Sequence, residues 1–146
     1  MLSPHFSLAE MTVSQTAARR GIKNEPDAAQ TENLRRLAQL LEQVRGVTNQ
    51  PLTVNSGFRS QQVNTLIGGV PTSEHCDGRA ADIICPAYGN PYQLAKAIEA
   101  ANIPFNQLIL EYGQWVHISI PKAGYGAKMQ TLTYRHGMAV TRGLIA

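Results

Sequence analysis

The 146-residue sequence has only two cysteines, no long apolar run and no recognisable export signal. Cys76 and Cys85 are too few for a disulfide framework, and their spacing does not decide whether they are bridged. No apolar segment reaches the roughly 18 residues of a membrane span. Residues 1–6 lack the basic start and long apolar stretch of a signal peptide, which predicts synthesis in the cytoplasm without Sec-type export.

Charged side chains make up only 16% of the chain, whereas apolar residues make up 43%. This mixture favours a packed core and excludes an intrinsically disordered chain, which would need low hydrophobicity and high net charge. A chain of this length typically buries about 70% of the surface of its unfolded form, so it folds without disulfides. We therefore expect one domain over residues 1–146.

The net charge of +3 is unevenly distributed, because residues 121–146 contain no acidic side chain. This basic tail suggests weak attraction to a polyanion such as a cell-wall polymer, nucleic acid or lipid headgroups, but four charges over 26 residues is sparse and favours a solvated end that aids solubility. Apart from Tyr125 and Tyr134 the tail has no aromatic platform, so we expect no specific nucleic-acid binding. Its basic residues are Lys122, Lys128, Arg135 and Arg142.

Capping residues and apolar spacing predict five helices. The clearest covers residues 26–45, where Leu34, Leu37 and Leu41 follow three- and four-residue steps and Gly46 is the expected C-cap. Ser, Asn and Pro at helix starts indicate the other four, which begin near Leu8, Ser14, Ser60 and Asn90. Short strands are expected at 51–55 and 81–85, with a weak strand near 129–134.

Residues 107–120 predict a β-hairpin. When the apolar faces of its two strands are matched, Glu111 lies on the same side as Trp115 and His117. This match requires a loop with an odd number of residues, which 112–114 supply with a glycine. A two-residue turn would instead place the Glu111 carboxylate on the buried face, which is costly.

The polar segment 73–82 immediately precedes and enters a buried strand, and it offers His75 and Asp82 as ligands. With His117 from the hairpin they form a suitable ligand set for one catalytic zinc ion, leaving a fourth position for water. Gly78 permits the sharp turn that brings His75 back towards Asp82. Glu111 lies near enough to His117 to act on the water without being a ligand. The chain has no His-Glu-x-x-His helix, which excludes that type of zinc site.

The pattern Ser73-x-His75-x-x-Gly78-x-Ala80-x-Asp82, followed by Glu111 and Trp115-Val116-His117, resembles the signature of the zinc D-Ala-D-Ala carboxypeptidase and dipeptidase family. That family includes peptidoglycan-cleaving phage endolysins and shares its fold with the hedgehog signalling domain. Residues 6–11 and 55–60 are similar to a small phage and prophage branch. The resemblance covers roughly residues 5–120, and the tail 121–146 is less diagnostic.

The resemblance implies an α+β fold, with helices packed on one side of a small antiparallel sheet and one zinc ion in an open groove. It assigns His75, Asp82 and His117 as zinc ligands, Glu111 as the catalytic base, Arg59 as the contact of the substrate carbonyl and Ser73 as a residue near the bound peptide. From the residues alone, the alternative for Arg59 is a surface ion-pair partner, but its position at the end of a short strand, beside Gly57, favours the site. Trp115 is expected either to line the groove and contact substrate or to pack beside the zinc.

We therefore expect a zinc metallopeptidase that cleaves stem or cross-link peptides of bacterial peptidoglycan, at a bond involving a D-amino acid. It would act as a monomer on the cell wall or in the periplasm, and the resemblance suggests a phage origin. D,D-carboxypeptidase and endopeptidase activities both remain open. The alternative is a zinc-containing binding module or a structural phage protein without activity, against which the presence of Glu111 argues.

Overall fold

Five α-helices and a six-stranded sheet make up the computed structural model, which describes residues 1–146 and confirms the α+β class. The N-terminal part contains α1 (Leu8–Thr12), α2 (Gln15–Arg20), α3 (Ala28–Thr48), β1 (Thr53–Ser56) and α4 (Gln61–Leu66). A short 3-10 helix, η1 (Glu74–Asp77), then leads into β2 (Ala80–Ile84), α5 (Pro91–Ala100) and β3 (Gln107–Glu111). The last strands are β4 (Trp115–Ser119), β5 (Gln130–Tyr134) and β6 (Thr141–Arg142).

The strands are ordered β1-β2-β4-β3-β5-β6 across the sheet. All neighbours are antiparallel except β3 and β5, so the sheet is mixed rather than wholly antiparallel as expected. The long connection after β4 returns the chain to the far side of β3 and allows β5 to run in the same direction. The weak strand expected near 129–134 is therefore a full member of the sheet.

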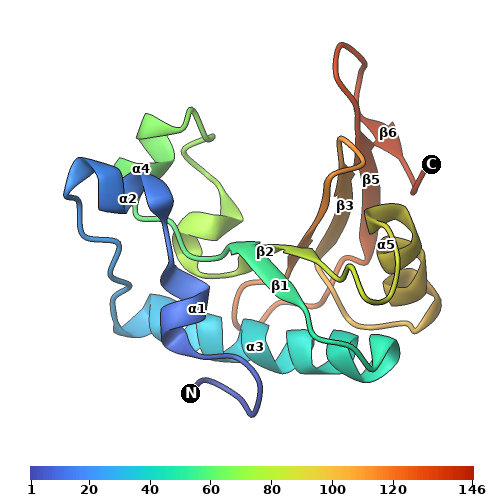
Figure 1. Ribbon diagram of the computed structural model, residues 1–146, viewed down its shortest axis with the longest axis horizontal. Helices are drawn as coiled ribbons and strands as arrows, with labels where there is room; N and C mark the ends of the chain where they lie inside the picture. The colour runs from blue at the N-terminus through green and yellow to red at the C-terminus, as the bar shows by residue number, and fades with distance from the viewer.

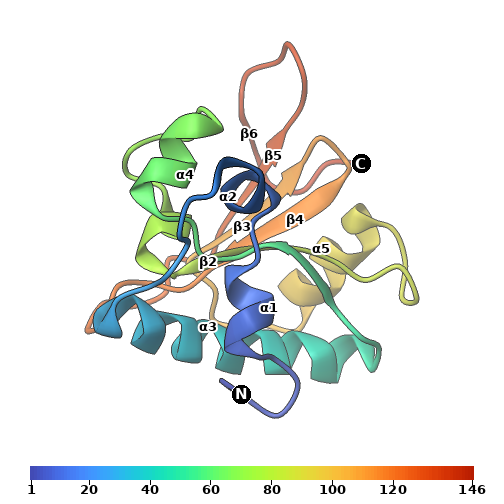
Figure 2. The ribbon, with the colours of Figure 1, turned by 60° about the vertical axis from the view of Figure 1, so that its left-hand side comes forward.

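Helices α3 and α5 share one apolar core with the sheet. The core includes Leu37 and Leu41 of α3, Ile98 of α5 and Val116 and Ile118 of β4, all of them fully buried. In Figures 1 and 2, α3 lies below strands β1 and β2, whereas α2 and α4 lie above them. Helices α3 and α5 therefore pack on one side of the sheet as expected, whereas the short helices α2 and α4 flank the opposite side.

Helix α3 ends later than its sequence suggested. Asp27 caps its start with a side chain that accepts from the backbone of Gln30, and Gln30 reaches back to the Asp27 backbone. Gly46 lies inside the helix, and Asn49 is the C-cap in the left-handed region, with φ of 52°. Asparagine tolerates this conformation, so a glycine was not required for the stop.

The predicted hairpin is confirmed, with a loop of residues 112–114 and the register Glu111 opposite Trp115 and Ile109 opposite His117. Cys76 and Cys85 are both buried and free, so there is no bridge between them. None of the helices combines the length and apolarity that a membrane crossing requires.

Candidate metal centre

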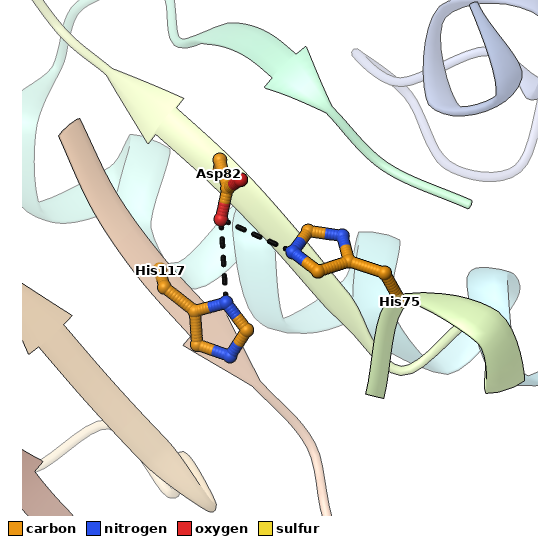
Figure 3. A group of neighbouring side chains, drawn as sticks. All are labelled: His75, Asp82 and His117. Carbon is orange, nitrogen blue, oxygen red and sulfur yellow. Dashed lines mark hydrogen bonds and ion pairs between the residues drawn. The ribbon is translucent and has the colours of Figure 1, made fainter. Parts of the chain in front are cut away.

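His75, Asp82 and His117 converge from three different elements, η1, β2 and β4 (Figure 3). Oδ1 of Asp82 lies 3.2 Å from Nε2 of His75 and 3.3 Å from Nδ1 of His117. One donor atom from each residue lies within 4.8 Å of the other two. The structure therefore brings together the three side chains that the sequence predicted as ligands.

The turn before β2 fixes the position of His75. The Ser73 hydroxyl accepts from the backbone N–H of His75 at the start of η1. Gly78 ends this turn with φ of 75°, and a Cβ there would lie 2.6 Å from the carbonyl oxygen of Gln30 in α3. Only glycine meets both conditions, so the sharp turn expected at this position depends on the absence of a side chain.

The Nδ1 atom of His75 lies 2.7 Å from the carbonyl oxygen of Gly57. A carbonyl oxygen only accepts hydrogen bonds, so Nδ1 donates its N–H to Gly57 and Nε2 is the ring atom that faces Asp82. Gly57 itself packs so closely against the backbone of Met11 that a Cβ at this position would clash with the Met11 carbonyl oxygen. The backbone that follows β1 thus selects the tautomer of His75.

The sheet register and Glu74 fix His117. Asp82 and His117 are direct partners across β2 and β4, so their side chains leave the same face of the sheet. Nε2 of His117 lies 3.1 Å from Oε1 of Glu74, which assigns the proton to Nε2 and leaves Nδ1 facing Asp82. Glu74 is itself held by the side-chain amide of Asn106, at 3.0 Å.

The donor set fits zinc. Two imidazole nitrogens and one carboxylate oxygen are the usual ligands of a catalytic zinc ion. A tetrahedral site with bonds of about 2.0–2.1 Å has donor atoms about 3.3–3.4 Å apart. The two separations measured from Oδ1 of Asp82, 3.2 and 3.3 Å, agree with this spacing. His75, Asp82 and His117 are therefore the residues that would hold the ion.

The electrostatics of this cluster favour a positive charge at its centre. Burial opposes ionisation of Asp82, but the charge of His75 and hydrogen bonds from both histidines lower its pKa well below the ordinary 3.8. Burial also opposes protonation of His117, yet its hydrogen bonds with Asp82 and Glu74 raise its pKa from 6.5 to about 9. A divalent cation competes with that proton for the same lone pair, so zinc binding at neutral pH releases it.

The cluster opens into a groove of about 510 Å³, lined by all seven of the residues singled out from the sequence. Trp115 donates from Nε1 to Oε2 of Glu111 at 2.8 Å, which leaves the other oxygen of Glu111 unengaged by this bond. Burial and the charge of Asp82 raise the pKa of Glu111 above its ordinary 4.5. The seven residues are Arg59, Ser73, His75, Asp82, Glu111, Trp115 and His117.

Arg59 lies at the wall of this groove and makes no ion pair within the chain. Its backbone N–H donates to the carbonyl of His75 at 3.1 Å, which ties the start of α4 to η1. Its side-chain Nε is buried without a hydrogen-bond partner. Arg59 also lines a neighbouring pocket beside α2, and its role at the metal groove stays a prediction.

Sequence reasoning missed Glu74, Gly57 and Tyr134. Glu74 directly precedes His75 within a polar run, but only the fold shows that it reaches His117. Tyr134 lines the groove because β5 places it beside Glu111 in the parallel register. Cys76, which follows His75, is buried outside the donor cluster, and Cys85 donates from Sγ to the carbonyl of Pro51.

The comparison with curated proteins gives no match. Residues 4–119, a span that runs from before α1 to the end of β4 and includes the three donor residues, match the Peptidase M15 family. This match agrees with the motif resemblance and with the α+β fold. The chain therefore belongs to the Peptidase M15 family, the zinc peptidases that act on peptidoglycan and are related to D-Ala-D-Ala carboxypeptidase.

Proposed function

We propose that the protein is a zinc-dependent hydrolase of peptidoglycan stem or cross-link peptides, and that it cleaves a bond next to a D-amino acid. The observation that carries this proposal is the orientation of the three donors. Gly57 and Glu74 each engage one ring nitrogen, so the other nitrogen of each histidine and the Asp82 carboxylate face one another. Three such donors directed at one another suit a metal cation among them, and an open groove gives a peptide access to it.

The two activities consistent with this site are a D,D-carboxypeptidase and an endopeptidase of the endolysin type. We further propose that the protein acts as a monomer on the cell wall or in the periplasm, since every groove residue comes from one chain. A phage origin is part of this proposal, and it rests on the resemblance of residues 6–11 and 55–60 to the phage branch.

The ion's contribution to the mechanism is Lewis-acid chemistry: zinc lowers the pKa of water to about 7 and polarises the scissile carbonyl. Glu111 takes the proton from the attacking water at the oxygen that Trp115 does not hold, and later delivers it to the leaving amine. Its raised pKa brings this base closer to neutral pH, where proton transfer in both directions is efficient.

Arg59 stabilises the negative charge that develops on the carbonyl oxygen, because its guanidinium stays charged at all relevant pH values. Loss of one such donor typically lowers the rate about 10²–10³-fold. Ser73 supports the groove wall as the cap of η1, and Trp115 both lines the groove and orients Glu111.

The test is digestion of purified peptidoglycan by the zinc-loaded protein and by its Glu111→Gln variant. We expect the native protein to release peptide products and the variant to lose hydrolysis by about 10²–10⁴-fold with unchanged zinc content. Mass spectrometry of the products then separates the activities, because free D-Ala indicates a carboxypeptidase and new amino termini within cross-links indicate an endopeptidase.

Two results contradict the proposal. Hydrolysis that survives Glu111→Gln would remove the role of Glu111 as the base. A native protein that binds zinc with high affinity yet leaves peptidoglycan intact would favour the alternative of a binding or structural phage protein.

A further inference from the structure

A second cavity of about 480 Å³ adjoins the metal groove. The two cavities share Glu74 and Gln107 in their walls, so Glu74 separates the second cavity from His117. Its outer wall is the connection between β4 and β5, which contributes Pro121, Lys122, Tyr125, Gly126 and Lys128. We call this cavity the lysine pocket.

The two lysines are the unpaired charges of this pocket. Arg79, the third cation in its wall, is buried and bound to Asp77 at 3.0 Å, to Glu74 at 3.5 Å and to the carbonyl of Ile120 at 3.0 Å. Its donors are thus directed to partners within the chain. Lys122 and Lys128 are exposed and form no ion pair, and residues 121–146 hold no acid that could neutralise them.

The connection that carries the lysines is anchored at both ends. The N–H of Ile120 donates to the carbonyl of Arg79 at 2.9 Å, and Arg36 of α3 donates to the carbonyl of Pro121 at 2.9 Å. At the other end the N–H of Gln130 donates to the carbonyl of Asn106 at 3.1 Å. The lysines are therefore held over the same wall that Glu74 and Gln107 share with the metal groove.

We propose that the lysine pocket binds a carboxylate of the substrate peptide, so that the protein prefers peptidoglycan fragments with free carboxylates to amidated ones. This inference rests on the proposed peptidase function. The two cavities share Glu74 and Gln107 in their walls, and one residue of an extended peptide spans about 3.3–3.6 Å, so a peptide bound in the metal groove reaches the neighbouring cavity within a few residues. Two flexible ammonium groups suit a single carboxylate there, whereas a long polyanion would need charges spread over a larger surface.

The experiment compares two peptidoglycan fragments of identical sequence, one with free carboxylates and one with these groups amidated. We expect native protein to hydrolyse the acidic fragment with a kcat/KM about three- to tenfold higher, since exposed charge pairs are individually weak. The preference should reside in KM and should shrink at high salt. Lys122→Gln/Lys128→Gln should bring the ratio close to one, and the charge-matched control Lys23→Gln/Lys96→Gln should keep it.

Binding gives a readout that does not depend on hydrolysis. Trp115 is the only tryptophan and lines the metal groove, so its fluorescence reports binding of either fragment to the zinc-loaded Glu111→Gln variant. A carboxylate preference in binding that the lysine substitutions remove supports the pocket even if native protein hydrolyses neither fragment, a result that would defeat the proposed function alone.

Three outcomes overturn the inference while leaving the peptidase function intact. The first is equal hydrolysis of both fragments by native protein. The second is a preference that survives Lys122→Gln/Lys128→Gln. The third is loss of binding to whole cell walls in that variant with an unchanged preference between the fragments, which would assign the lysines to a wall polyanion instead.

Discussion

The two faces of strands β2 and β4 differ completely in chemistry, although the same strands supply both. On one face Ala81, Ile83, Val116 and Ile118 are fully buried against the helices. On the other face Asp82 and His117 lie between them in the sequence and form the metal centre. Side chains alternate along a strand, so a slip of one residue would move each set to the opposite face.

The apolar face of β2 and β4 sets the geometry of their polar face. Each fully buried aliphatic side chain contributes about 1.5–3 kcal/mol to folding, and that burial holds the register of β2 against β4. The register in turn places Asp82 opposite His117. The charged face gives little stability in return, because buried charged groups lose hydration that their partners only partly replace. Stability and function therefore reside on opposite faces of one pair of strands.

The sharpest test of this comparison is His117→Gln on the polar face. Loss of a residue that only hydrogen-bonds to a metal ligand typically lowers metal affinity roughly 10–100-fold. Because His117 is itself a predicted ligand, we expect a larger fall in zinc affinity and the loss of hydrolysis. Unfolding by denaturant in the presence of a chelator should change far less than in a core variant, because His117 is not part of the apolar core cluster. A large loss of stability in this variant would contradict the assignment of stability to the apolar face alone.

The matching change on the apolar face is Ile118→Ala, one residue further along β4. We expect it to lower the free energy of unfolding by about 2–5 kcal/mol, because it leaves a cavity in a fully packed core. Zinc stoichiometry, measured in the fraction that remains folded, should be unchanged. A variant that keeps its stability but loses zinc would show that the two faces are not separable.

Glu74→Gln probes the support of the metal centre with an intermediate effect. The substitution removes the charge that holds Nε2 of His117, so we expect zinc affinity to fall about 10–100-fold in a chelator competition. Asp77→Asn is the matched control, since Asp77 pairs with the same Arg79 but does not reach His117. Equal losses in the two variants would assign the effect to Arg79 rather than to His117.

The smallest expected effect is that of Trp115→Phe on the pH profile. Its hydrogen bond lowers the pKa of Glu111, so its removal raises that pKa further. Glu111 acts in its ionised form, which is lost as pH falls through its pKa. The acid limb of kcat/KM should therefore move to higher pH. Tyr112→Phe, which keeps the ring that packs against Trp115, should leave the limb in place.

The hairpin was predictable because its information is local, whereas the donor residues were assigned through the motif resemblance. The odd-numbered loop at 112–114 followed from the alternation of apolar residues alone, and it placed Glu111 beside Trp115 and His117 as the structure has them. The end of α3 was mispredicted because both Gly46 and Asn49 are acceptable stop residues, and the packing of Val44 and Thr48 carries the helix past the glycine.

Two other features depend on contacts between distant parts of the chain. The parallel pairing of β5 with β3 cannot be read from residues 129–134, because any strand direction satisfies their alternation. The role of Glu74 requires η1 to lie over β4, a contact between residues 43 positions apart. Motif spacing predicted the ligands, but the residues that orient them became visible only in three dimensions.

The position of β5 and β6 has a consequence for how the protein behaves at high concentration. Without them β3, with its Leu-Ile-Leu centre, would present open backbone groups on which another molecule could add a strand. The sheet instead terminates in β6, of two residues, and in β1, of four residues with an interrupted register between Val54 and Ser56. Both borders are short, so each offers few open backbone groups for a further strand to pair with.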